Sequence, residues 1–300
     1  MKKSKKLLLL LLALVLLLSA FTGCRARDGG PVEEEAEPAS SVVEETSPPA
    51  VSDKKISDVI EDMTSEVKSR KDLNSDTVGW FMLHELGVSD VVVMSTESNE
   101  FYRRRNFNKE EEFNGVLYAD RRSTFGNGSA EELGVNTCIY GHTLTNIRSS
   151  PDFNVFFGPL FDLRDQTIAR DIPYMFFSTE KENLVFEIFA VFIANTDNAD
   201  LPYNRNDIPA DEFVEMVRTQ VLPRSFYNYN VDIKDDDKFL TLSTCLYRMP
   251  DGTQLNYKTT YYRYAVMGKL VDPDQPLKLE ADFTLNPNPL IDPDGPMASV

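Results

Sequence analysis

Cysteine and histidine are scarce in this chain, whose 300 residues contain three of the first and two of the second. Three cysteines at unrelated positions do not build a disulfide framework, and neither paired cysteines nor a second well-placed histidine supplies the ligand spacing of a metal site. Basic stripes are missing too, and a formal net charge of -17 repels phosphate backbones. We therefore expect no metal site and no nucleic-acid partner.

An apolar run long enough to span a bilayer is also missing near the N-terminus. Residues 7–18 are almost all leucine, but these 12 residues fall short of the roughly 20 that cross ~30 Å of hydrocarbon. A basic start before this run and small residues after it make residues 1–24 a three-part export signal. The run Phe21-Thr22-Gly23-Cys24 resembles a bacterial lipobox, which predicts a lipid on Cys24; an uncleaved signal anchor is the alternative. Both place the rest of the chain outside the membrane.

Two further segments have compositions that do not favour a packed core. Residues 25–55 are rich in Glu, Pro and Ser, so we expect a disordered acidic tether. Residues 272–300 hold several prolines among aspartates, and we expect an extended tail that adds nothing to the core. Residues 56–271 remain as one folded domain.

Short runs of β-forming residues dominate that domain. We expect eight strands, over residues 78–83, 88–94, 115–119, 136–140, 172–178, 184–194, 239–243 and 263–270. Strands at this density favour an antiparallel barrel or sandwich. Apolar residues at helical spacing predict one helix over residues 56–73 and another over 210–222, ended by Pro223. The fold class is therefore mostly β, with a helical excursion before the seventh strand.

A cysteine and an arginine lie on two of these neighbouring strands. Cys245 ends the run Thr241-Leu242-Ser243-Thr244-Cys245, and Arg263 begins the eighth strand. Because side chains alternate along a strand, Ser243 and Cys245 share one face. A nearby guanidinium or imidazolium lowers the pKa of a thiol, and the N–H fork of arginine can hold an oxyanion. His142, just after the fourth strand, supplies a proton carrier.

Each of these residues has a purely structural explanation when it is taken alone. Free cysteines are often buried, lone histidines often cap or pack, and strand arginines usually lie on solvated faces. We expect Cys138 to be a buried structural thiol. His84 and Arg248 are interpreted as polar surface or loop residues without a chemical role.

Taken together, the motifs resemble those of the class B sortases, cysteine transpeptidases of Gram-positive cell surfaces. The run from Thr241 to Cys245 matches the nucleophile motif of that family. Tyr140-Gly141-His142 matches its histidine motif, and the run from Arg263 to Leu270 matches its arginine strand. The likeness covers about residues 56–271, with a connection between Cys245 and Arg263 that is longer than usual.

The resemblance implies a fold and a set of site residues. The fold is a closed eight-stranded β-barrel with an N-terminal helix and a helix inserted before the nucleophile strand. The catalytic residues are Cys245 as nucleophile, His142 as proton carrier and Arg263 as oxyanion ligand. Thr244 and Ser243 are expected to contact the substrate. No metal and no organic cofactor are implied.

The implied reaction joins a secreted protein to an amine on the cell surface. The enzyme cleaves an NPxTx-like or LPxTG-like sorting signal after threonine and transfers it to a peptidoglycan cross-bridge or a pilin lysine. Its expected location is the outer face of the cytoplasmic membrane of a Gram-positive bacterium. An inactive, lipid-anchored sortase-like binding or scaffold protein is the alternative.

Two other classes of cysteine enzyme fit the sequence less well. The serine-histidine-glycine run of L,D-transpeptidases is missing before Cys245. A papain-like cysteine precedes its histidine, whereas His142 comes first here.

Overall fold

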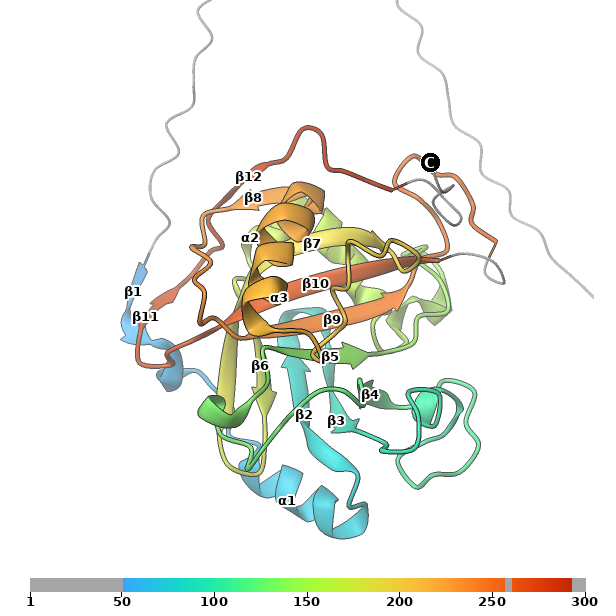
Figure 1. Cartoon of the computed structure of the whole chain (residues 1–300), viewed down its shortest axis with the longest axis vertical. Helices are drawn as coiled ribbons and strands as arrows, with labels where there is room; N and C mark the ends of the chain where they lie inside the picture. Colours follow the sequence, from blue (N-terminus) through green and yellow to red (C-terminus); the bar gives the residue numbers. More distant parts are fainter. Residues whose placement is uncertain (1–50, 257–260, 293–300) are drawn as a thin grey trace, which may run out of the picture. The chain divides into compact units, whose positions relative to one another are not determined.

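The computed structural model describes residues 51–256 and 261–292 (Figure 1). The predicted export signal, Cys24 and most of the predicted tether lie outside the described residues, so these remain predictions. Within the described part, none of the helices combines the length and the apolar character needed to cross a membrane.

Eight strands close into a barrel, and all eight were expected from the sequence. They are β2 (Thr77–Leu83), β3 (Val88–Val93), β4 (Leu117–Ala119), β5 (Asn136–Tyr140), β6 (Tyr174–Ser178), β7 (Asn183–Asn195), β9 (Phe239–Cys245) and β10 (Tyr262–Val271). Neighbours around the barrel follow the order β10-β7-β6-β2-β3-β4-β5-β9. Most neighbouring pairs are antiparallel, but β3 runs parallel to β4 and β5 runs parallel to β9. Of the two architectures expected from the sequence, a barrel and a sandwich, the structure has the closed barrel.

Strand β7 is an almost unbroken apolar run because both of its faces are covered. Val191 and Ile193 belong to the core inside the barrel, whereas Ala190 and Phe192 pack into a second cluster outside it. The outer cluster is formed with the helix α3 (Ala210–Met216) and the segment around it. A strand buried on both faces loses the alternation of apolar and polar residues that marks a half-exposed strand.

The helix predicted over residues 56–73 is divided. A short 3-10 turn, η1 (Ile56–Asp58), is separated from the helix α1 (Thr64–Leu73). The backbone N–H groups of Ile56 and Ser57 donate to the carbonyls of Gln275 and Pro273, at 3.0 and 2.8 Å, instead of joining a helix. Long-range pairing thus prevails over helical periodicity at this point.

The helix predicted over residues 210–222 is confirmed, with a change of pitch. After α3 the chain continues through a π-helical turn, η7 (Val217–Val221), and a 3-10 turn, η8 (Leu222–Arg224). Pro223 lies inside that last turn, so helical structure ends at Arg224, two residues later than predicted. The other short helices are η2 (His84–Leu86), η3 (Tyr102–Arg104), η4 (Ala130–Glu132), η5 (Pro151–Asn154), η6 (Gly158–Arg164) and α2 (Gln166–Arg170).

The prediction that residues 272–300 add nothing to the core is wrong. Strand β11 (Pro276–Lys278) pairs with β1 (Val51–Lys55), and β12 (Phe283–Leu285) pairs with β8 (Tyr227–Tyr229). Phe283 is only 3% exposed, and its ring lies 4.4 Å from that of Tyr227 between centroids. The pairing with β11 also shows that the predicted tether ends in a strand and not in disordered chain.

A C-terminal strap, residues 286–292, continues from β12 across the barrel. The side chain of Asn286 donates to the carbonyl of Ser225 at 2.8 Å, and the partly buried carboxylate of Asp292 pairs with the buried Arg224 at 2.6 Å. The hydroxyl of Tyr262 donates to the carbonyl of Asp292. The strap therefore ends next to the first residues of β10.

Truncation of Phe283 to alanine is expected to lower the free energy of unfolding by about 3–5 kcal/mol, because a buried ring is removed and a cavity remains. Urea unfolding measures this. Leu285, on the same strand but 57% exposed, is the matched control, and Leu285→Ala is expected to change stability by about 0.5 kcal/mol or less. Equal losses for the two variants would contradict burial of β12 against the core.

Candidate active site

Cys245 and Arg263 lie directly opposite each other on adjacent antiparallel strands. The register of β9 against β10 pairs these two residues, and it continues with Thr244 opposite Tyr264 and Ser243 opposite Ala265. Residues opposite each other in an antiparallel pair project to the same face, with Cβ atoms about 4.5–5.5 Å apart. Both side chains are partly exposed. The structure thus places Cys245 and Arg263 opposite each other, and their catalytic roles stay predictions.

The segment that carries His142 lies on the other side of Cys245. Strand β5 pairs with β9 in parallel, with Tyr140 at the level of Ser243. The contact continues past the strand end, because Gly141 donates its N–H to the carbonyl of Ser243 at 3.3 Å. The hydroxyl of Thr244 donates back to the carbonyl of Gly141 at 2.7 Å. Continuation of this register brings His142 to the level of Cys245.

Ser243 and Thr244 are held inside the protein. They are 2% and 3% exposed, and the hydroxyl of Ser243 lies 3.0 Å from that of Tyr203. The hydroxyl of Thr244 is engaged by the Gly141 carbonyl. Little of either side chain is left for a substrate to touch, so their contact with a peptide stays a prediction. Their hydrogen bonds instead fix the strand on which the thiol sits.

His142 is partly buried, and its ring is held in place by one backbone group. Nε2 lies 2.7 Å from the carbonyl oxygen of Arg103. A carbonyl only accepts, so Nε2 carries the proton in this contact. Burial lowers the pKa of His142 below its ordinary value, the charges of Arg104 and Arg103 lower it further, and the Arg103 carbonyl and Glu100 oppose the shift. The neutral imidazole is therefore favoured near pH 7.

The pKa of His142 is expected to lie below 6.5. Glu100→Gln is expected to lower this pKa further, because it removes a carboxylate that favours the imidazolium. Since the unfolded chain binds this proton more tightly, the contribution of His142 to stability is present above pH 6.5 and falls as the pH drops through the folded pKa. NMR titration of the imidazole protons in a His84→Gln background measures both values. A midpoint above 6.5, or a rise in Glu100→Gln, would contradict the assignment.

A polar network beneath the site supports the end of β5. The buried carboxylate of Asp120 accepts from the hydroxyl of Tyr140 at 2.8 Å and from the guanidinium of Arg122 at 2.6 and 2.7 Å. These hydrogen bonds and the charge of Arg122 hold the pKa of Asp120 below its usual value, although burial opposes them. Cys138 is fully buried on the same strand, and burial raises the pKa of its thiol. The prediction of a buried thiol at this position is confirmed.

A groove of about 570 Å³ opens beside His142, and it was not predicted from the sequence. We call it the histidine groove; its lining consists of Arg104, Phe113, His142, Leu144, Thr145, Asn146, Ile147, Tyr247 and Gln254. The hydroxyl of Tyr247 donates to the carbonyl of Thr143 at 3.1 Å and so ties the loop after β9 to the loop that follows His142. Burial raises the pKa of Tyr247, and the nearby Cys245 thiol adds to the shift.

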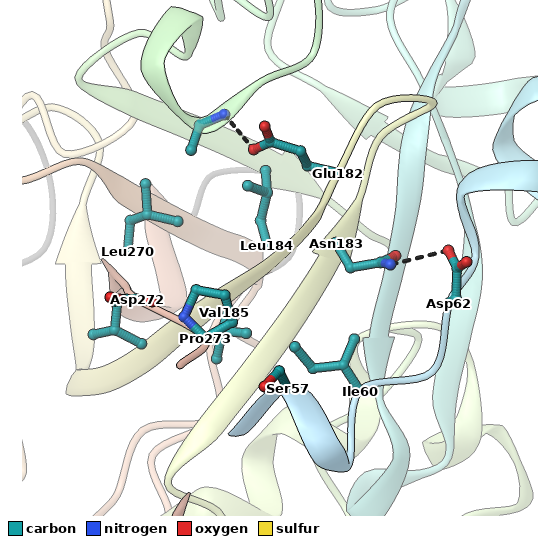
Figure 2. A pocket seen from close by; sticks show the side chains of 12 residues that line it. Ser57, Ile60, Asp62, Glu182, Asn183, Leu184, Val185, Leu270, Asp272 and Pro273 are labelled. Carbon is teal, nitrogen blue, oxygen red and sulfur yellow. Dashed lines mark hydrogen bonds between the residues drawn. The ribbon is translucent and has the colours of Figure 1, made fainter. Parts of the chain in front are cut away.

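A larger cavity, of about 680 Å³, lies at the other end of the barrel (Figure 2). Leu270, one of its lining residues, is near the end of β10 opposite to Arg263. Its carboxylates already have partners: Asp62 accepts from Asn183 and Glu182 from the backbone N–H of Ala130, both at 2.9 Å. Asp272 accepts from the backbone N–H of Asp274 at 2.8 Å. None of the predicted catalytic residues lines it. In the described part of the chain, no cluster of three or more His, Cys, Asp or Glu side chains could hold a metal ion.

Comparison with known proteins gives a consistent set of relatives. No family model matches the chain. The chain is 27% identical to sortase B of Listeria monocytogenes over 210 residues, which cover 70% of this chain and 76% of that protein. The fold resembles that of a Staphylococcus aureus sortase B–substrate complex, with a TM-score of 0.55, 23% identity and coverage of 69% of this chain and 85% of that one. For Clostridium perfringens sortase B the TM-score is 0.54, with 23% identity and coverage of 68% and 99%.

Proposed function

We propose that this chain is a class B sortase, a cysteine transpeptidase that cleaves a C-terminal sorting signal after threonine and transfers the protein to a surface amine; its similarity to sortase B proteins over about 70% of its length supports this. The observation that carries the proposal is the order of residues across three adjacent segments. His142 lies on one side of Cys245, and Arg263 lies on the other.

In the first half-reaction the Cys245 thiolate attacks the carbonyl carbon of the threonine. The oxygen becomes an oxyanion, and the guanidinium of Arg263 stabilises it through N–H donors. His142, as imidazolium, gives its proton to the departing amine while the C–N bond breaks. The products are a thioester on Cys245, a free amine and a neutral imidazole.

In the second half-reaction an amine attacks the thioester carbonyl. Neutral His142 takes the proton from that amine, and Arg263 again holds the oxyanion. The C–S bond then breaks, a new amide forms, and the thiolate and imidazolium are restored. Because the pKa of His142 is lowered, the imidazolium needed for the first half-reaction is a minority form near pH 7.

The proposed substrates are secreted proteins with an NPxTx-like or LPxTG-like signal, and the proposed acceptors are amines of a peptidoglycan cross-bridge or a pilin. A sortase B structure with a bound substrate is among the similar folds, which supports the binding of such a signal. We propose attachment to the outer face of the cytoplasmic membrane of a Gram-positive bacterium through residues 1–24, with a lipid on Cys24. Feeding cells labelled palmitate tests the lipid, and a chain that never acquires the label would exclude it.

The test of the reaction uses the full-length chain in detergent with one fluorogenic peptide of each signal type. Mass spectrometry of the trapped protein is expected to find the acyl fragment on Cys245. Addition of an amine is expected to convert the product from free acid to amide. If neither peptide is cleaved and no adduct appears on Cys245, the transpeptidase function is overturned for these signals, and an inactive scaffold role is favoured.

A further inference from the structure

The histidine groove lies on one side of the nucleophile only. Arg263 approaches Cys245 from β10, and the segment of His142 approaches from β5. The groove is lined by His142 and the residues that follow it, but not by Arg263. Because His142 is the group that exchanges a proton with the amine in the proposed reaction, an amine has to bind next to His142. The groove is therefore placed for the amine and not for the acyl group.

The charge of this groove is unusual for so acidic a protein. Arg104 is exposed and lines the groove, and none of the lining side chains is a carboxylate. Among the ion pairs between described residues, none includes Arg104. Its guanidinium is held by the ring of Phe113, 4.4 Å from the ring centroid, and by the carbonyl of the same residue. The groove thus presents a positioned, unpaired positive charge close enough to depress the pKa of His142.

Asn146 adds a hydrogen-bond acceptor to the same groove. Its Nδ2 donates to the carbonyl of Arg248 at 2.7 Å, which fixes the orientation of the amide. Its Oδ1 is buried and has no hydrogen-bond partner within the described residues. A buried acceptor without a partner costs free energy, which a ligand N–H recovers.

We propose that the histidine groove binds the amine substrate, that Arg104 selects an amine whose molecule also carries a carboxylate, and that Asn146 Oδ1 accepts an N–H from it. This rests on the proposed function and names the chemical class of its second substrate. The cation of Arg104 and the acceptor of Asn146 complement the two ends of such a molecule. The same positive charge disfavours the ammonium form of the bound amine, so that more of it is in the neutral, attacking form.

A matched pair of acceptors tests the selection by Arg104. Glycylglycine and glycylglycinamide carry the same attacking amine, and only the first has a carboxylate. With whichever sorting peptide the wild-type chain cleaves, kcat/KM is expected to favour glycylglycine. Arg104→Gln is expected to reduce that preference about tenfold, since hydrogen bonds to charged groups contribute about 1.5–3 kcal/mol. Arg104→Lys is expected to retain part of it.

Two further variants make the result specific. Arg148→Gln removes a cation that pairs with Asp162 at 3.4 Å and does not line the groove, so the preference is expected to be unchanged. Asn146→Leu is expected to raise KM for both acceptors alike. The ratio between the acceptors cancels any change in the first half-reaction.

Different results would overturn the selection by Arg104 and the proposed transpeptidase function. Hydrolysis of the sorting peptide without amine reports thioester formation, and its absence would overturn the function itself. If hydrolysis proceeds but the wild type shows no preference for glycylglycine, or Arg104→Gln keeps the wild-type preference, the assignment of Arg104 is overturned.

Discussion

Cys245→Ala is expected to lower kcat for peptide cleavage and for amide formation by about 10⁴-fold or more, because the variant lacks the sulfur that forms the proposed thioester. The strand is expected to stay folded, since the variant removes one partly exposed sulfur and keeps the hydrogen bonds of Ser243 and Thr244. Release of a fluorophore from the sorting peptide measures the loss. Binding of the uncleaved peptide is expected to persist.

Cys138 is the matched control, because it is the other free cysteine in the described part of the chain. Cys138→Ala is expected to keep cleavage within about threefold of the wild type and to lower stability by about 1 kcal/mol through lost packing. If cleavage survives in Cys245→Ala, or disappears in Cys138→Ala while that variant stays folded, Cys245 is not the nucleophile.

Arg263→Ala is expected to lower kcat by about 10²–10³-fold with a much smaller change in KM, because the guanidinium acts on charge that develops only in the transition state. One of its nitrogens, Nη1, donates to the carbonyl of Tyr262 at 2.8 Å, which holds the fork in position. Lysine has a point charge in place of a planar fork. Arg263→Lys is therefore expected to recover only part of the loss.

Arg248→Ala is the control for general effects of charge near the site. Arg248 is exposed, and among the described residues its side chain hydrogen-bonds only to Gln254, at 3.3 Å. Its backbone carbonyl accepts from Asn146, and this hydrogen bond is kept in the variant. The kcat of the Arg248→Ala variant is expected to stay within about threefold of the wild type. A larger fall in Arg248→Ala than in Arg263→Ala would place the oxyanion ligand in the loop and not on β10.

Strand periodicity predicted the barrel well because its strands are long or strongly apolar. The strands that the sequence did not reveal are β1, β8, β11 and β12, which form two-stranded pairs outside the barrel. Three of them have three residues each, and β11 begins with a proline. Such segments become strands only because a distant segment supplies the hydrogen bonds, and no local pattern records that partner.

The residues of the candidate site also differ in whether a local sequence pattern predicts them. Cys245 and Arg263 were predicted because both lie on strands, where residue type and alternation give the face. Arg104, Asn146 and Tyr247 lie in loops or a short 3-10 turn, which carry no periodic signal. Their convergence on one groove depends on how far-apart segments pack, and the sequence offered no way to bring them together.

The pairing of β1 with β11 has a consequence for where the enzyme can work. The described chain enters the domain at Val51, whose strand pairs with the segment just after the end of β10, and Arg263 lies at the opposite end of β10 (Figure 1). Ten residues of strand at about 3.3 Å each separate the two ends by roughly 30 Å. A chain held by its proposed leader thus carries a rigid spacer between its point of attachment and its nucleophile. Under the proposed attachment through residues 1–24, the length of the barrel adds to the reach of the nucleophile.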